Sequence, residues 1–254
     1  MIEKKNILGV GITNSTKEEI LEYIIKSLEN FEKKLFFVTP NPEFLVLANK
    51  NPAFKNILNR ADLALNDGIG VLIAGKILGK KLKQRFTGVE LLENLCLMLA
   101  EKPITVGFLG GRPGVAEKTA ECLQKKYPGL RISFVGEEWP EDNMDDRRLK
   151  VEDRNSSTFY HLPSSIDILF VAFGAPKQEM WISENLDKIP VKIAIGVGGA
   201  FDYISGRVER APLWVQKIGL EWLYRLIREP WRIQRQLSLL EFAWLVFKEK
   251  LKEN

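Results

Sequence analysis

Histidine and cysteine are scarce in this 254-residue sequence, which has one histidine and two cysteines. His161 lies in a stretch with no periodic pattern, so we expect a loop residue and no Ser-His-Asp arrangement around it. Cys96 and Cys122 fall within helical patterns and have no histidine nearby, which indicates buried thiols and favours a cytosolic setting.

Long apolar runs are also absent. A membrane-spanning helix needs roughly 20 apolar residues, and the nearest stretch, residues 239–247, is short and includes Glu241. The first ten residues contain too short an apolar run for a signal peptide. We therefore expect a protein that can lie on a membrane but does not cross it.

Metal-ligating patterns are poor as well. The acidic cluster between residues 141 and 146 is followed at once by Arg147 and Arg148, so a solvated charge run is the expected interpretation. The sequence predicts no metal and no other cofactor. Residues 137–165 are acidic, then rich in serine and threonine, and show no clear period.

The positive charge is concentrated at the C-terminal end. Residues 207–254 contain ten Lys and Arg against six Glu, which accounts for the whole net charge of +4, and they hold four of the six tryptophans. A neutral body with a basic, tryptophan-rich tail indicates a surface-binding end. The alternative is a helix that only completes the core.

Arginines in this tail are spaced for one helical face. Arg225, Arg228, Arg232 and Arg235 follow at steps of three, four and three, and Pro230 is expected to kink or restart the helix between them. Arginine forks suit diphosphates, whereas tryptophans suit a bilayer interface. The tail therefore predicts contact with an anionic membrane surface.

Apolar strand-like runs alternate with helical patterns in the rest of the chain. Strands are predicted at residues 7–12, 35–39, 62–66, 104–109, 130–136, 166–173 and 191–197, and helices at 17–31, 43–50, 52–60, 71–78, 88–100, 113–126 and 177–187. This alternation predicts an α/β fold: a Rossmann-like, doubly wound, mainly parallel sheet over residues 1–211 with a helical, membrane-associating appendage over 212–254.

Ligands of open parallel sheets bind beyond the carboxyl ends of the strands. Residues suited to a substrate site there are Thr39, Asn41, Asn66, Asp67, Gly68, Gly110, Gly111, Gly114, Gly174, Pro176, Lys177, Gln178, Glu179, Gly198, Gly199 and Asp202. Asp67 is the best acid/base candidate, because a carboxylate can accept the proton of an attacking alcohol and Gly68 would let a substrate approach. By spacing alone, Asp67 could equally cap the helix at 71–78.

The glycine-rich turn at 107–114 stands between a strand and a helix, where bare amides could meet a phosphate. It is neither a dinucleotide fingerprint nor a P-loop, and glycines also end strands. A nucleotide-binding oxidoreductase is therefore a remote alternative. A nucleic-acid binder is disfavoured, because the tail's tryptophans alternate with leucines instead of forming a stacking face.

Six stretches in order along the chain are similar to one known family. They are TPNPEFLVLANKN (39–51), NDGIGV (66–71), KQRFTGVELLENLC (83–96), GFLGGRPGVAEKTAE (107–121), FVAFGAPKQEMWI (170–182) and GGAFDYISGRVERAPLWVQKIGLEWLYRLIREPWR (198–232). Together they resemble the WecG/TagA/CpsF family of bacterial glycosyltransferases over nearly the whole chain. Glu90 stands where the family more usually has Asp.

The resemblance implies an inverting, metal-independent enzyme of cell-envelope polymer synthesis that moves a sugar from a UDP donor to a lipid-diphosphate sugar. In the teichoic acid branch the sugar is N-acetylmannosamine and the acceptor is undecaprenyl-diphosphate-N-acetylglucosamine. N-Acetylmannosaminuronic acid and glucose are the alternatives, for exopolysaccharide or enterobacterial common antigen-type glycans.

The resemblance also implies roles for single residues. Asp67 matches the proposed base, Thr39 its pocket neighbour and Gln178 a loop that faces the donor. Arg85 belongs to the matching RFTG turn. Arg225, Arg232 and Arg235 match the arginines that hold the diphosphate. The expected location is the inner face of the bacterial plasma membrane, and a homo-oligomer that hides the tail's apolar face is compatible with the sequence.

Overall fold

The computed structural model describes residues 2–140, 165–230 and 233–253. Six strands form one parallel sheet in the order β4-β3-β8-β7-β5-β6. Their bounds are Leu35–Val38 for β3, Leu63–Ala64 for β4, Thr105–Gly110 for β5, Arg131–Gly136 for β6, Ile166–Ala172 for β7 and Val191–Gly196 for β8. The predicted parallel α/β core is confirmed.

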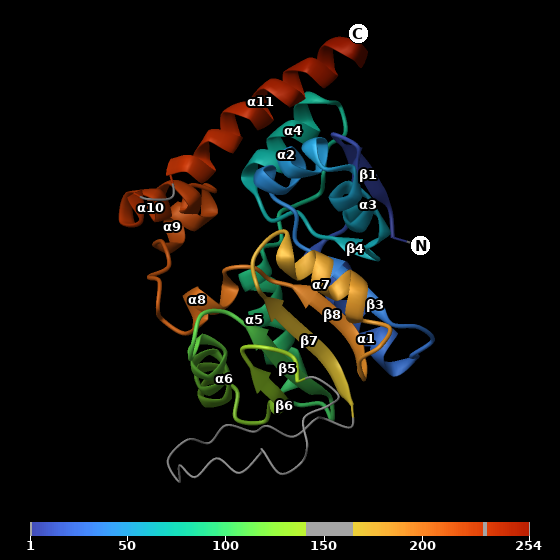
Figure 1. Cartoon of the computed structure of the whole chain (residues 1–254), viewed down its shortest axis with the longest axis vertical. Coiled ribbons are helices and arrows are strands. Elements are labelled where there is room, and N and C mark those ends of the chain that lie inside the picture. The colour runs from blue at the N-terminus through green and yellow to red at the C-terminus, as the bar shows by residue number, and fades with distance from the viewer. Residues whose placement is uncertain (1, 141–164, 231–232, 254) are drawn as a thin grey trace.

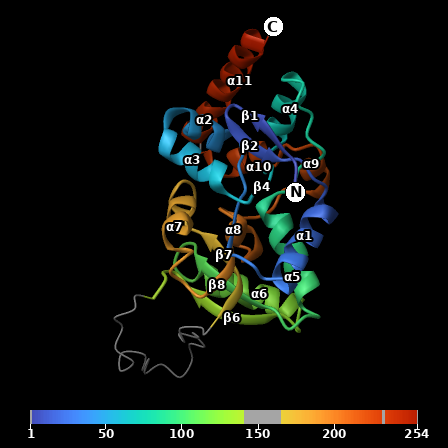
Figure 2. The ribbon, with the colours of Figure 1, turned by 90° about the vertical axis from the view of Figure 1, so that its right-hand side faces the viewer.

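Helices cover both faces of this sheet, as the doubly wound interpretation requires (Figures 1 and 2). One face carries α1 (Lys17–Glu29), α5 (Gly88–Leu99), α6 (Val115–Lys126) and α8 (Ala200–Ile204), and the other carries α3 (Pro52–Arg60) and α7 (Lys177–Asn185). Helices α2 (Pro42–Lys50) and α4 (Ile69–Ile77) extend this second apolar cluster beyond the strand ends, where α2 packs on α3 and the C-terminal helix, and α4 packs on the C-terminal helix and the N-terminal hairpin. Neighbouring residues of β3 separate accordingly, because Phe36 and Phe37 belong to different apolar clusters. Both faces of the strands are thus buried.

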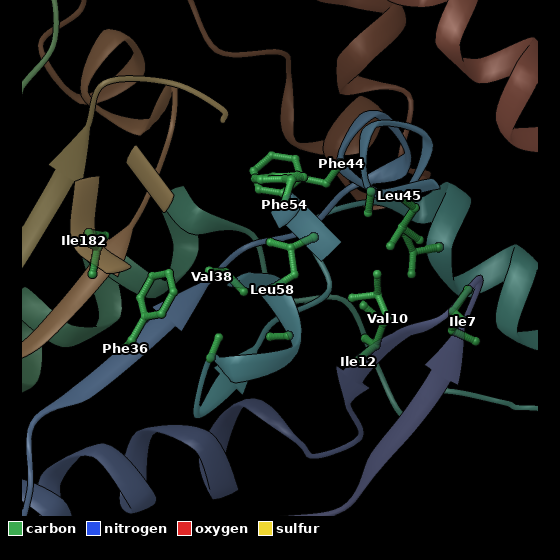
Figure 3. Close-up of a cluster of buried hydrophobic side chains, with 14 of the residues drawn as sticks. Ile7, Val10, Ile12, Phe36, Val38, Phe44, Leu45, Phe54, Leu58 and Ile182 are labelled. Atoms are coloured by element: carbon green, nitrogen blue, oxygen red, sulfur yellow. The ribbon is translucent and has the colours of Figure 1, made fainter. Parts of the chain in front are cut away.

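The first predicted strand, residues 7–12, is wrong. The chain instead forms an antiparallel hairpin of β1 (Lys4–Ile7) and β2 (Val10–Thr13), separate from the parallel sheet. Leu8 and Gly9, both at positive φ, make the turn. The apolar run is continuous because Ile7, Val10 and Ile12 are all buried in one apolar cluster with residues of α2, α3 and α4 (Figure 3). A hairpin and a single strand therefore give the same sequence pattern here.

Helix starts follow local capping chemistry. Asn41 caps α2 and Asn51 caps α3, each ahead of a proline, and both side chains accept a backbone N–H. Thr87 and Glu90 form a capping box at the start of α5, which accounts for a glutamate at this position. Gly68 is the N-cap residue of α4, and no side chain caps this helix, so the alternative role of Asp67 as its cap is wrong.

The C-terminal segment forms α9 (Leu213–Lys217), α10 (Glu221–Arg228) and the long α11 (Ile233–Glu253). Helix α10 ends at Arg228, which confirms the break predicted at Pro230. In Figure 1, α11 runs along α2 and α4, and it buries Phe242, Leu245 and Val246 among the core residues of that face. None of the described helices is long and apolar enough to cross a membrane.

Candidate active site

A cavity of about 900 Å³ opens where the parallel strands end. It is built from the loops after β3, β4, β7 and β8 and is covered by α10 and α11. Its polar side chains include Thr39, Asn41, Asp67, Arg85, Gln178, Asp202, Glu221 and Arg225, and the Gly198–Gly199 turn adds backbone surface. The carboxyl ends of the strands and the C-terminal helices therefore share one site, in the place where open parallel sheets bind ligands.

Asp67 follows β4 and is fixed by backbone contacts on two sides. Its N–H donates to Pro40 O at 3.0 Å, and its carboxylate accepts the N–H of Gly88, the first residue of α5. Gly88 itself packs closely, because a Cβ there would lie 3.1 Å from Val197 O. The carboxylate therefore stands at a helix N-terminus and remains partly exposed to the cavity.

Burial raises the pKa of Asp67 to about 7, with smaller contributions from the negative charges of Glu221 and Glu90. The Gly88 hydrogen bond and the positive charge of Arg85 act in the opposite direction. A carboxyl group that titrates near neutral pH can both take up and release a proton under working conditions. The assignment of Asp67 as the general base stays a prediction, for a residue that lines the cavity and has a near-neutral pKa.

Arg85 connects this carboxylate to the C-terminal segment. Its Nη2 donates to Gln216 O in α9 at 3.0 Å, and its charge acts on Asp67. Gly219, in the turn between α9 and α10, approaches Ile69 so closely that a Cβ would lie 2.6 Å away. These two contacts hold the covering helices against the loop that carries Asp67.

Thr39 and Gln178 line the cavity, but their side-chain oxygens form hydrogen bonds with backbone groups. Thr39 Oγ1 donates to Gly196 O at 2.9 Å. Gln178 Oε1 accepts from Gly174 N at 3.2 Å and from Gly198 N at 3.1 Å. Both residues therefore fix the glycine turns after β7 and β8, and a direct contact of either with a donor stays a prediction.

Glu179 holds the Gln178 amide in this orientation. Gln178 Nε2 donates to Glu179 Oε1 at 2.6 Å, while Glu179 Oε2 is buried without a hydrogen-bond partner among the described residues. Burial raises the pKa of Glu179 to about 7. Glu179 is fully buried and does not line the cavity, so it is a second near-neutral carboxyl group that substrates do not reach.

Arg225 crosses from α10 to the turn after β8. Its Nη2 lies 3.3 Å from Asp202 Oδ2 and its Nε lies 2.5 Å from Glu229 Oε2. A Cβ on Gly199 would lie 3.0 Å from Arg225 Nη1, and the guanidinium stacks 4.9 Å from the centroid of the Tyr203 ring. The structure thus places one of the predicted arginines beside the predicted glycine turn.

The glycine turn after β5 differs from the expectation of free amides. Gly111 N donates to Ala172 O at 3.1 Å, and Gly114 N donates to Glu137 Oε1 at 2.9 Å. Gly110 is not part of the cavity lining, and a Cβ there would lie 2.6 Å from the Phe173 ring. Packing therefore explains Gly110, and the Gly111 amide is already bonded within the protein.

Of the two asparagines predicted for the site, Asn41 lines the cavity and Asn66 does not. Asn41 lines the cavity while its Oδ1 caps α2. Asn66 is buried, lies outside the cavity lining, and accepts Gly68 N at 3.2 Å, so it shapes the turn beside Asp67. Arg232, His161 and the acidic cluster at 141–146 fall outside the described residues, and the side chain of Arg235 is not described either.

One acidic residue of this cavity, Glu221, is missing from the sequence-based set. Glu221 lines the cavity and raises the pKa of Asp67 through its charge, and Glu179 supports Gln178. Glu221 comes from a helix far along the chain, so no local pattern joins it to Asp67. Glu179 directly follows Gln178. Because α7 begins with the charged Lys177, the sequence gives no indication that Glu179 is buried.

Glu179→Gln is expected to raise the melting temperature at pH 8 and to change it little at pH 4. The folded pKa of about 7 exceeds the ordinary 4.5, so wild-type stability falls as pH rises between these values and the neutral amide avoids this loss. Thermal unfolding of both proteins across this pH range measures the effect. Equal pH dependence in the two proteins would contradict it.

The fold and the cavity define an enzyme that brings a near-neutral carboxyl group and guanidinium groups to the substrate end of a parallel sheet. Residues 5–254 match the model of the glycosyl transferase WecG/TagA/CpsF family, and the chain belongs to that family. It is therefore a glycosyltransferase, as the resemblance in its motifs implied.

Similar proteins cover nearly the full chain. The N-acetylglucosaminyldiphosphoundecaprenol N-acetyl-beta-D-mannosaminyltransferase of Staphylococcus aureus (strain MRSA252) is 33% identical over 98% of this chain and 94% of its own length. Enzymes of the same name from Bacillus spizizenii and Bacillus subtilis are 32% and 28% identical, each over 98% of this chain and 93% of their own length.

Proposed function

We propose that this enzyme transfers N-acetylmannosamine from a UDP donor to undecaprenyl-diphosphate-linked N-acetylglucosamine. The observation that carries the proposal is the placement of Asp67, whose pKa is about 7, in the same cavity as Arg225 and the Gly198–Gly199 turn. The names of the similar enzymes from Staphylococcus and Bacillus support this acceptor and this sugar.

In the proposed reaction, Asp67 takes the proton of the acceptor hydroxyl as that oxygen attacks the anomeric carbon of the donor. The bond between the anomeric carbon and the UDP oxygen breaks on the opposite side, so the configuration inverts. The departing diphosphate carries the negative charge, and Arg225, with Arg85 nearer the base, would stabilise it. We propose that these guanidinium groups replace a metal ion, as the resemblance implied.

The C-terminal helices support a peripheral membrane location. Large apolar side chains are more than half exposed along this segment: Leu213, Trp214, Ile218, Ile227, Ile233, Leu237, Leu240, Trp244, Phe247 and Leu251. Such a surface is larger than isolated exposed residues explain, and Lys and Arg lie among them. We propose that this surface rests on the anionic inner face of the plasma membrane; the domain boundary at 211/212 and a homo-oligomer stay predictions.

A panel of UDP-sugars offered with undecaprenyl-diphosphate-N-acetylglucosamine in vesicles tests the reaction. UDP release is expected with UDP-N-acetylmannosamine and only when the acceptor is present. Release with UDP-N-acetylmannosaminuronic acid or UDP-glucose instead would assign the alternative donors. No acceptor-dependent release with any donor would overturn the proposed function.

A further inference from the structure

The cavity does not end at the polar site around Asp67. It continues between α4 and α11, where its lining is apolar: Ile73, Ala74 and Ile77 come from α4, and Phe242, Ala243, Val246 and Phe247 come from α11. Ile73 and Ile77 are about half exposed, whereas Val71 and Ala74 of the same helix are buried. This apolar part is called the α4–α11 groove.

The walls of the groove are fixed in position. Phe242, Leu245 and Val246 anchor α11 among buried core residues. Ion pairs flank the helix on both sides, from Lys50 to Glu241 at 2.5 Å on the α2 side and from Lys80 to Glu249 at 3.2 Å on the α4 side. These core contacts and ion pairs fix the position of α11 and therefore of one wall of the groove.

Polarity changes along the cavity in one direction. Asp67, Arg85 and Arg225 lie at the end near the sheet, whereas the stretch between α4 and α11 is lined mainly by aliphatic and aromatic side chains, with Ser238 of α11 among them. A nucleotide sugar is polar throughout and gains nothing from the apolar stretch. The arrangement matches a molecule with an anionic head and a hydrocarbon chain. Binding of the chain in the groove removes apolar surface of both the chain and the protein from water.

We propose that the α4–α11 groove binds the first isoprene units of the acceptor's polyprenyl chain. The acceptor's diphosphate then lies where the groove meets the polar site, and the remainder of the chain continues into the bilayer beside the exposed apolar surface of α11. This proposal rests on the proposed function, since it assumes a polyprenyl-diphosphate acceptor. It assigns chain recognition to the protein itself and not to the membrane alone.

Two water-soluble acceptors separate these contributions without any membrane. Both carry N-acetylglucosamine diphosphate, one with a two-isoprene geranyl chain and the other with a methyl group. The wild-type enzyme is expected to prefer the geranyl acceptor by about tenfold or more in kcat/KM. Ala243→Trp places an indole in the groove and is expected to bring that ratio close to one.

Leu237→Trp is the matched control, because Leu237 is exposed on the same helix but does not line the cavity. It is expected to keep the wild-type ratio. Equal use of both acceptors by the wild-type enzyme, or an unchanged ratio in Ala243→Trp, would overturn the groove. Absence of transfer to the geranyl, methyl and undecaprenyl acceptors alike would instead overturn the proposed function.

Discussion

Asp67→Asn is expected to fold normally and to transfer sugar at least about a hundredfold more slowly than the wild-type enzyme, the usual cost of losing a general base. Asparagine keeps the size of the side chain and an oxygen that can accept the Gly88 N–H, so the loop after β4 should keep its shape. UDP release with saturating acceptor measures the loss, and near-normal turnover would remove Asp67 from the mechanism.

The pH profile of the wild-type enzyme gives the same residue a second readout. Because the pKa of Asp67 is about 7, the base form grows as pH rises, and kcat should increase through pH 7 and then level off. A rate that is flat between pH 5 and pH 8 would contradict this assignment.

Stability should change in the opposite direction to activity. The folded protein holds the Asp67 proton more tightly than the unfolded chain, whose value is near 3.8, so the free energy of unfolding falls as pH rises from about 4 to about 7. Each unit of pKa corresponds to about 1.4 kcal/mol. Asp67→Asn should therefore melt at a higher temperature than the wild type at pH 8.

Glu179→Gln is the control for this behaviour. Both carboxyl groups have a pKa of about 7, but only Asp67 lines the cavity. Both variants should gain stability above pH 7, whereas Asp67→Asn alone should lose the base step. If the two variants lose turnover equally, the rate effect reflects the buried polar network and not proton transfer.

The triple variant Trp214→Gln, Ile227→Gln and Leu240→Gln is expected to weaken binding to anionic vesicles by about a hundredfold or more. Each side chain is more than 60% exposed, so its replacement costs the fold little. Each would otherwise bury apolar surface worth roughly 1.5–3 kcal/mol on entering the bilayer interface. Sedimentation with vesicles that contain phosphatidylglycerol measures the change.

A matched triple elsewhere on the surface controls for general loss of apolarity. Phe31, Leu97 and Met180 are exposed outside the C-terminal segment, and their replacement by Gln should leave vesicle binding unchanged. Removing residues 212–254 altogether should also release the protein from vesicles and abolish transfer to lipid acceptors. That deletion also takes Phe242, Leu245 and Val246 from the core, so the point substitutions isolate the surface. Equal loss in the two triples would contradict a specific membrane face.

The sequence predicts the parallel sheet well because its strands are buried on both faces and alternate with capped helices. A short, continuous apolar run such as residues 166–173 predicts a buried strand. Asn41 and Thr87 mark helix starts, because their side chains accept hydrogen bonds from nearby backbone N–H groups. The hairpin at Lys4–Thr13 escapes prediction, because Ile7, Val10 and Ile12 are all buried and a continuous apolar run does not show where the chain turns.

By itself the sequence determined the order of most elements and the end of the sheet at which the cavity lies, and it singled out Asp67 as a candidate base. Those features depend on period, capping and strand ends, which are local. Only the tertiary structure decided that Gln178 and Thr39 hold glycine turns, that the Gly111 amide is occupied, and that α4 and α11 form one apolar groove. Each of these features depends on groups far apart in the chain. The distances between those groups and the burial of their side chains are set only when the helices pack.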